Sequence, residues 1–376
     1  MLESQAGLHP KNTMWRVERR CGLCGLGRAW MDYNPPMTWD VLGHSWAGEL
    51  LKQHIAAGSV RHAYLFTGPE QVGKRTLALA FAMALNCPQP PSAGEACGRC
   101  RTCMGLRSES HPDLSVVRLK PEDSEIKIDA VRELQRQLAL TPHQARLRIA
   151  LLVDFELASE SAQNALLKTL EEPAEKVVLL ITAHTTASLL PTLVSRCEIL
   201  NLRPLNPDAI EQALSAEGEA PERARLLAAL SAGKPGLARS LASDAELLAR
   251  RMAALDEMSR LLSATRGERF AAAESWARRR KRTEELEAVR RRVEEMLTTW
   301  LTLWRDALLM SHGTQAHVAN PDRHADLERL TGGLPSETLA AGVLAIRTTL
   351  DRIDRNANIQ LALENLMLDL PRLPGR

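Results

Sequence analysis

The stretch HAYLFTGPEQVGKRT, residues 62–76, decides the fold of this chain. Residues 63–67 form a short apolar run of strand length, which ends at Gly68 in a loop. From Thr76 to Leu85 the pattern is that of a helix. A loop between a strand and a helix is the context that a phosphate-binding loop requires. Its glycines let backbone N–H groups turn toward phosphate oxygens, and the helix N-terminus adds its dipole.

Within this loop, Gly68 and Gly73 supply the turns and Lys74 is placed to reach terminal phosphates. The next position needs a Ser or Thr hydroxyl to hold Mg²⁺, but it is occupied by Arg75, which cannot ligate a cation. Thr76 lies about 100° further round the helix and does not simply substitute for it. The sequence therefore leaves ATP binding open, while efficient Mg²⁺-dependent hydrolysis does not follow.

A second departure concerns the acidic residues after the strand of residues 149–153. A hydrolase of this kind uses an adjacent acidic pair, one residue for Mg²⁺ and one for the attacking water. Here Phe155 separates Asp154 from Glu156. If the strand continues, both carboxylates share one face. The alternative is that Asp154 is only a capping or surface acid.

Continuous apolar runs at residues 149–153 and 177–181 predict strands buried on both faces, as in a parallel sheet covered by helices. Strands that alternate with helices give an α/β class with a parallel sheet. After Pro204 the strands stop and the pattern is helical to the end. We therefore expect four regions: an N-terminal extension at 1–36, an α/β module at 37–203, a small helical domain at 204–245 and an all-helical domain at 246–376.

Residues 1–36 show no clear period, so we expect poor order there. Their Cys21 and Cys24 have CxxC spacing, which is a weak metal signal without a second pair beside it. We favour the alternative that translation starts at Met31 or Met37.

The composition excludes several classes of protein. With 376 residues, 45% hydrophobic and 25% charged, the chain is long enough for two or three domains. A net charge of +2 gives no global basic field for nucleic acid. The sequence has no apolar run long enough to span a membrane and no apolar stretch typical of a secretory signal. We therefore expect a cytoplasmic protein.

Four of the seven cysteines cluster at Cys87, Cys97, Cys100 and Cys103. Without an export signal, such a cluster indicates metal binding rather than disulfides. Thiolates at CxxC spacing converge on one tetrahedral Zn²⁺, and four of them leave no open position for substrate. The prediction is a structural zinc insert at 87–103; the alternative is four reduced thiols without a ligand.

Further motifs carry a resemblance to a known family. The stretch NALLKTLEEP at 164–173 and Ser195-Arg196-Cys197, with VLGH at 41–44 and NANIQLALE at 356–364, resemble the bacterial DNA polymerase III clamp-loader family of AAA+ proteins over about residues 37–372. The resemblance implies an AAA+ P-loop module, a helical lid and a helical collar that joins a ring of subunits. It also implies as partners the gamma/tau motor subunits, the delta subunit, the sliding clamp and primer-template DNA, with location at the nucleoid or replisome.

Two subunit types share these motifs: the ATP-hydrolysing gamma/tau motor and the delta-prime stator. In this chain Arg75 replaces the hydroxyl, and Gly236 stands where the second sensor has arginine. An ungapped comparison with the motor puts Val153 at the Mg²⁺-binding aspartate and Asp154 at the glutamate, and a one-residue shift would change this. The first sensor, a polar residue near 182–184, is not assigned by the sequence. These departures favour the stator, which takes part in loading without intrinsic ATP hydrolysis. An active motor subunit is the main alternative, and a stand-alone AAA+ protein in another DNA transaction is a third.

The resemblance also assigns a role to Arg196. In the family, the arginine of Ser-Arg-Cys reaches into the neighbouring subunit's ATP site. A guanidinium remains charged and presents a fixed fork of donors, which suits a developing phosphoryl charge. Arg196 is therefore the expected catalytic residue, acting on a neighbour's nucleotide. The alternative is a structural arginine that ties its loop to the sheet.

Overall fold

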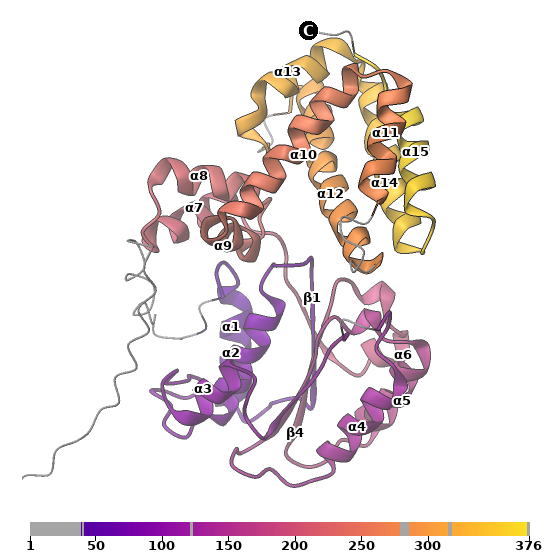
Figure 1. Ribbon diagram of the computed structural model, residues 1–376. Coiled ribbons are helices and arrows are strands. Elements are labelled where there is room, and N and C mark those ends of the chain that lie inside the picture. Colours follow the sequence, from indigo (N-terminus) through magenta and orange to yellow (C-terminus); the bar gives the residue numbers. More distant parts are fainter. Residues whose placement is uncertain (1–38, 40, 121–122, 279–285, 315–317, 374–376) are drawn as a thin grey trace, which may run out of the picture.

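A computed structural model describes residues 39, 41–120, 123–278, 286–314 and 318–373 (Figure 1). The predicted N-terminal extension lies outside these residues, and so do Cys21, Cys24 and the proposed start sites Met31 and Met37. From bottom to top in Figure 1, the described chain forms a sheet with helices on both sides, a small group of helices and a larger helical bundle.

The sheet has five parallel strands in the order β2-β3-β4-β1-β5. β1 lies between β4 and β5, so the chain order reverses beside it, and the carboxyl ends of such strands are where α/β proteins bind ligands. The predicted α/β class with a parallel sheet is confirmed. The strands are β1 (Ala63–Thr67), β2 (Leu114–Val117), β3 (Arg148–Leu152), β4 (Val177–Ala183) and β5 (Glu198–Asn201).

Alternate strand residues build two cores on opposite faces of the sheet. Tyr64 and Phe66 pack into the core beneath α1 and α2, while Leu65 packs into the core beneath α4 and α5. This two-sided burial explains why the strands are continuous apolar runs in the sequence. The covering helices are α1 (Ser45–Ala56), α2 (Lys74–Asn86) and α3 (Arg101–Arg107) on one side, and α4 (Ile128–Leu138), α5 (Glu160–Glu171) and α6 (Pro191–Val194) on the other (Figure 1).

Three short helices follow the sheet and share a small core of their own. Each begins with a proline at its first position, where the missing N–H costs no helical hydrogen bond. Ile210, Leu227 and Leu241 are among the buried residues that hold them together. These helices are α7 (Pro207–Ala216), α8 (Pro221–Leu230) and α9 (Pro235–Ser243).

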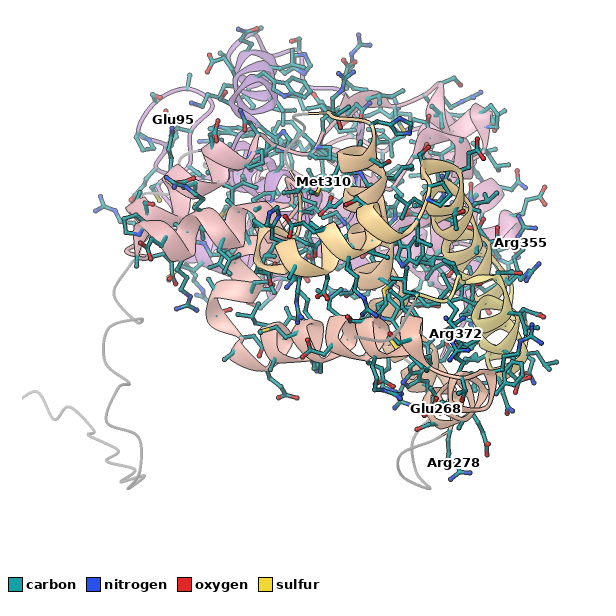
Figure 2. All side chains as sticks on the ribbon, turned by 90° about the horizontal axis from the view of Figure 1, so that it is seen from above. Glu95, Glu268, Arg278, Met310, Arg355 and Arg372 are labelled. Atoms are coloured by element: carbon teal, nitrogen blue, oxygen red, sulfur yellow. The ribbon has the colours of Figure 1, made fainter. Side chains whose placement is uncertain are left out.

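The remaining helices form a bundle around a separate apolar core. Figure 2 shows the molecule from above, from the side of this bundle. Trp300 and Trp304 lie four residues apart on one helix and both are fully buried in this core. The buried guanidinium of Arg269 donates to backbone oxygens of Met367, Leu370 and Pro371, which ties the last helix to the bundle. The helices are α10 (Ala245–Ser263), α11 (Arg266–Ala277), α12 (Leu286–Ser311), α13 (His324–Gly333), α14 (Ser336–Asp354) and α15 (Ile359–Asp369).

Short 3-10 helices complete the elements: η1 (Phe155–Leu157), η2 (Thr186–Ser188) and η3 (Pro321–Arg323). Within the described ranges, none of the helices is both long and apolar enough to cross a membrane.

Candidate functional site

The loop between β1 and α2 has the backbone of a phosphate cradle. Gly68 and Gly73 have φ values of 142° and 111°, which L side chains rarely adopt. A Cβ on Gly68 would also lie 2.2 Å from the carbonyl oxygen of Leu202. Both glycines are therefore required by the loop, and Gly73 directly precedes the N-terminus of α2, where free N–H groups favour an anion.

Lys74 is held inside this loop. It is only 6% exposed, and its Nζ donates to the carbonyl oxygens of Gly68 at 2.7 Å and Pro69 at 3.1 Å. Burial lowers its pKa, and this effect is opposed by the charges of Asp154 and Glu156. The ammonium group thus lies within the loop, where two carbonyl oxygens of the loop itself accept hydrogen bonds from it.

Arg75 points away from the cradle. Its guanidinium forms an ion pair with Glu109, which follows α3, and Glu109 also pairs with Arg118. Only 10% of the Glu109 side chain is exposed, so the two arginines share one largely enclosed carboxylate. Thr76, the neighbouring hydroxyl, is exposed. The arrangement uses Arg75 as a link between the P-loop helix and the segment after α3, and it leaves the hydroxyl position for Mg²⁺ unfilled.

The acidic residues after β3 lie near Lys74, but not for the reason that strand alternation suggests. β3 ends at Leu152, Asp154 adopts a left-handed conformation with φ 49°, and Phe155 begins η1. The turn buries Phe155 completely and places Asp154 and Glu156 within electrostatic range of Lys74. The expectation that Asp154 and Glu156 share a strand face is therefore wrong, because β3 ends two residues before Asp154.

Asp154 is fixed by the end of β4. Its backbone N–H donates to the Thr182 hydroxyl at 2.8 Å. Burial raises the pKa of its carboxyl, and the nearby Lys74 opposes that rise. A carboxylate at this position can support a bound cation. The P-loop mechanism also uses a hydroxyl ligand, and Arg75 occupies the position of that hydroxyl.

His184, directly after β4, is paired with Glu156. One carboxylate oxygen, Oε1, accepts from the backbone N–H of His184 at 2.9 Å and lies 2.7 Å from its ring Nδ1. This hydrogen bond raises the pKa of His184; burial would raise the pKa of Glu156, but the bonds from His184 lower it. The other oxygen of Glu156 is buried without a hydrogen-bond partner among the described residues. The position near residues 182–184 that the sequence leaves unassigned thus holds an imidazole-carboxylate pair.

The group of helices α7–α9 contacts the P-loop directly. The backbone N–H of Gly236, in the first turn of α9, donates to the carbonyl oxygen of Gln71 at 2.9 Å. A Cβ added at Gly236 would lie 2.9 Å from that same oxygen, so no side chain fits there without movement. Arg239, the nearby arginine, is turned away and pairs with Glu217. At Gly236, where the resemblance to the family led us to expect an arginine, the structure has close backbone packing against Gln71.

The four predicted cysteines converge. The Sγ atoms of Cys87, Cys97, Cys100 and Cys103 all lie within 4.8 Å of one another. Backbone N–H groups of the cluster donate to three of the sulfurs, at 3.3–3.4 Å. Burial opposes ionisation of Cys97, but hydrogen bonds from the backbone and neighbouring thiols lower its pKa to about 6. Four thiols in this arrangement are able to hold one metal ion, with no position left for substrate.

Arg196 lies on a different part of the module, just after α6. Its Nη1 donates to the carbonyl oxygen of Thr192 at 2.7 Å, and its Nη2 donates to Oε1 of Glu171 at 2.8 Å. About a third of the side chain is exposed. The guanidinium is therefore oriented but still accessible from outside the chain.

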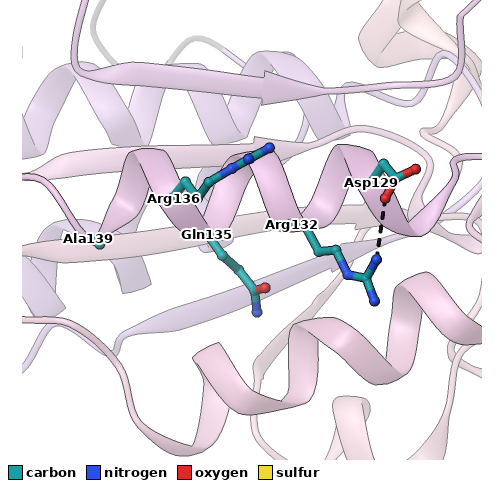
Figure 3. A pocket seen from close by; sticks show the side chains of 5 residues that line it. All are labelled: Asp129, Arg132, Gln135, Arg136 and Ala139. Atoms are coloured by element: carbon teal, nitrogen blue, oxygen red, sulfur yellow. Dashed lines mark hydrogen bonds and ion pairs between the residues drawn. The ribbon is translucent and has the colours of Figure 1, made fainter.

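A surface hollow of about 640 Å³ lies along α4, apart from the P-loop, and is open to solvent (Figure 3). Arg132 within it pairs with Asp129 at 3.4 Å on the same helix. The residues that line it are Asp129, Arg132, Gln135, Arg136 and Ala139. The hollow contains none of the residues predicted from the sequence to bind nucleotide or metal.

Several contacts of the site have no signal in the sequence. Gln71 and Glu171 lie inside the stretches 62–76 and 164–173, but no motif assigns them a contact, and Glu109 lies outside those stretches. His184 lies within the range where a sensor residue is expected, although its pairing with Glu156 follows from the turn after β3. Contacts between segments far apart in the chain leave no local pattern to read.

Comparison with known proteins agrees with this architecture. A family described as "DNA polymerase III, delta subunit" matches residues 43–206, and one described as "DNA polymerase III, delta subunit, C terminal" matches residues 271–371. Among solved structures, a gamma-subunit-related protein of Thermotoga maritima covers 86% of this chain and 97% of its own, with 18% identity and a TM-score of 0.38. That score is too low to compare sites.

Two similar proteins are each named DNA polymerase III subunit delta'. The Pseudomonas aeruginosa protein is 38% identical over 53% of this chain and 61% of its own length. The Bacillus subtilis protein is 28% identical over 86% of this chain and 94% of its own. The Escherichia coli subunit tau is 32% identical over 50% of this chain and 28% of its own. The chain therefore belongs to the DNA polymerase III clamp-loader family.

Proposed function

We propose that this chain is the delta-prime, or stator, subunit of a DNA polymerase III clamp loader. In this role it helps to load the sliding clamp onto primed DNA, without hydrolysing ATP itself. It contributes Arg196 to the nucleotide site of a neighbouring subunit. Similarity to two proteins named delta' supports the assignment, and one of these alignments spans most of both chains.

The observation that carries the proposal is the state of the P-loop. Arg75 occupies the position of the Mg²⁺-binding hydroxyl, and its side chain is paired with Glu109 instead of facing the cradle. Gly236 packs against Gln71 where a sensor arginine would need room. Phosphoryl transfer depends on positioned charge around Mg²⁺ and phosphate. A site with these two changes is suited to structure rather than hydrolysis.

The second candidate function is an active motor subunit, with which several residues of the P-loop region are compatible. Asp154 lies within electrostatic range of Lys74, both loop glycines have positive φ, and the similar subunit named tau is 32% identical over half of this chain. ATP binding and hydrolysis should be measured on the isolated chain and then in the reconstituted complex. The stator assignment predicts negligible hydrolysis alone; turnover by the isolated chain at a motor's rate would overturn it.

We also propose that the four-cysteine cluster holds a structural Zn²⁺. Four thiols whose sulfurs all lie within 4.8 Å of one another fit a tetrahedral site, and thiolate ligands favour zinc. The insert is also anchored from outside, because the indole Nε1 of Trp39 donates to the carbonyl oxygen of Gly94 at 2.8 Å. When bound, the ion would fix the loop between α2 and α3; it takes no part in ATP chemistry.

The proposed partners follow from the same assignment: gamma/tau motor subunits, the delta subunit, the sliding clamp and, through the complex, primer-template DNA. The three structural units then serve as the AAA+ module, the lid of α7–α9 and the collar of α10–α15. Such a complex works in the cytoplasm at the replisome. Size-exclusion chromatography with the other subunits tests this, because a stand-alone AAA+ protein would not co-elute with them.

A further inference from the structure

The side chain of Arg196 is oriented by a carboxylate from another helix. Glu171 is the last residue of α5, and its Oε1 accepts from Nη2 of Arg196 at 2.8 Å. The second bond, from Nη1 to the carbonyl oxygen of Thr192 at 2.7 Å, comes from the turn that carries the arginine. Two bonds to two different nitrogens fix the plane of the guanidinium, not only its position.

The helices beneath this ion pair are joined by further buried contacts. The amide of Gln163, buried in α5, accepts from the backbone N–H of Leu190 at 3.0 Å and donates to the carbonyl oxygen of Ala158 at 3.2 Å. Leu193 of α6 is fully buried in the core that α5 shares. These contacts pack α5 and α6 into one core, which supports the backbone segments that carry Glu171 and Arg196.

The outer part of the guanidinium remains available. A guanidinium has five N–H donors, and the two bonds above are those that the described chain provides to Arg196. Three donors are left on a side chain that is 35% exposed. Guanidinium donors in a fixed fork suit a phosphoryl group better than a freely rotating cation does.

The ion pair between Arg196 and Glu171 is also weak enough to be broken when another anion binds the arginine. With Glu171 52% exposed, water screens the attraction, and pairs of this kind contribute little to stability. A carboxylate at the C-terminal end of a helix is moreover disfavoured by the helix dipole, so the arginine offsets a local cost. The contact can orient Arg196 before assembly and still be exchanged for a phosphate.

We infer that Glu171 is a positioning residue for Arg196, holding its guanidinium ready for the nucleotide site of a neighbouring subunit. This inference rests on the proposed function, because it needs Arg196 to act in trans. Glu171 touches no reacting atom. Its contribution is orientation, which affects the rate of the chemical step more than the binding of ATP.

The test compares Glu171→Ala, Glu171→Gln, Arg196→Ala and the double variant in the reconstituted complex. We expect Glu171→Ala to lower kcat for DNA-stimulated ATP turnover about 3- to 10-fold with KM unchanged, well below the loss from removing a finger. Glu171→Gln keeps an acceptor oxygen and should stay within about twofold of wild type. The double variant should be no slower than Arg196→Ala alone, since both changes act through one contact.

Glu172→Ala is the matched control, because it removes the neighbouring exposed acid at the same helix end. If Glu171→Ala turns over like Glu172→Ala while Arg196→Ala is slow, the contact is incidental and the inference is overturned, with the proposed function intact. If Arg196→Ala is as fast as wild type, the proposed role of Arg196 itself fails. A purely structural role for Glu171 would lower kcat further in the double variant.

Discussion

The P-loop and the loop that carries Arg196 are the two segments to which nucleotide chemistry is proposed, and they differ in exposure and bonding. Lys74 is 6% exposed, is bonded to the carbonyl oxygens of its own loop and lies beside the backbone contact between Gln71 and Gly236. The side chain of Arg196 is 35% exposed and is held by only two hydrogen bonds within the described chain. The first loop is enclosed within the chain, while the second is accessible from outside it.

The difference fits the proposed division of roles, in which this chain keeps the fold of a P-loop and presents an arginine at its surface. The residues that remain in the P-loop serve the fold: glycines for the turn, a buried lysine for the loop and Arg75 for a link to Glu109. The side chain of Arg196 stays partly exposed, although two hydrogen bonds orient it. Site chemistry therefore has to be judged from where each side chain points, and not only from whether its motif is present.

The largest expected effect separates the two loops directly. Arg196→Ala should slow ATP turnover at the neighbouring site by about 10³-fold, the scale of losing an arginine finger. Lys74→Ala should have an effect at least about tenfold smaller, because the proposed stator does not hydrolyse ATP at its own P-loop. Both are measured as DNA-stimulated ATP turnover of the reconstituted complex.

Co-elution of each variant with the other subunits is the control for assembly. Equal losses from the two substitutions would contradict the division of roles, since they would make the closed loop as important to catalysis as the open one. Thermal melting of the isolated variants separates a catalytic loss from unfolding.

The next effect concerns the four-cysteine cluster, which lies between α2 and α3 on the P-loop side of the sheet. Cys103→Ser, at a fully buried ligand position, should release the metal and destabilise the insert by on the order of several kcal/mol, since metal binding and folding are coupled. Hydrogen exchange should then increase in α2 and α3, but not in α5 and α6. Metal analysis and exchange mass spectrometry measure both effects.

Cys197→Ser is the matched control, because Cys197 lies outside the cluster in the Ser-Arg-Cys loop, where burial raises its pKa to about 12. It should keep one metal ion per chain. A native protein with well under one zinc per chain would refute the proposed site, and faster exchange in α5 and α6 would show that the two loops are not supported separately.

Local sequence patterns are sufficient for much of this fold. The apolar run at residues 63–67 predicts β1, which lies there, and the runs at 149–153 and 177–181 correspond to β3 and β4 within a residue or two. Cysteine spacing is enough to group four thiols. The short strands β2 and β5 are not predicted, because four residues at a sheet edge carry little pattern.

The turn at Asp154 and Glu156 is not predicted by local sequence patterns. Strand alternation puts Asp154 and Glu156 on one face, but a left-handed residue and η1 set their positions instead. The partners of Arg75 and Arg196 lie 34 and 25 residues away in the chain, so only the folded structure pairs them. Motifs identify a site's members, and tertiary contacts decide their orientation.

A smaller effect is expected where α9 meets the P-loop. Gly236→Ala should destabilise the chain by about 1–3 kcal/mol, because the new methyl group meets the Gln71 carbonyl oxygen at 2.9 Å. Gly267→Ala is the matched control: it is also the second residue of a helix, but nothing lies within 4 Å of the added Cβ. It should be neutral or stabilising, since alanine favours helix. Equal melting temperatures for the two variants would show that the close contact between Gly236 and Gln71 does not form.

The smallest expected effect is the pH dependence of the His184–Glu156 pair beside the P-loop. The folded pKa of His184 is raised, so its contribution is full below about pH 6.5 and is lost as pH rises through the folded value. The folded pKa of Glu156 is lowered, so its contribution is present above about pH 4.3 and is lost as pH falls through the folded value. His184→Gln should therefore cost most between these limits, by less than about 1 kcal/mol because His184 is 42% exposed. Urea unfolding at about pH 5.5 and about pH 8.5, on either side of the ordinary histidine pKa, measures this, and a cost that is equal at both values would mean that the pair is not ionic in the folded chain.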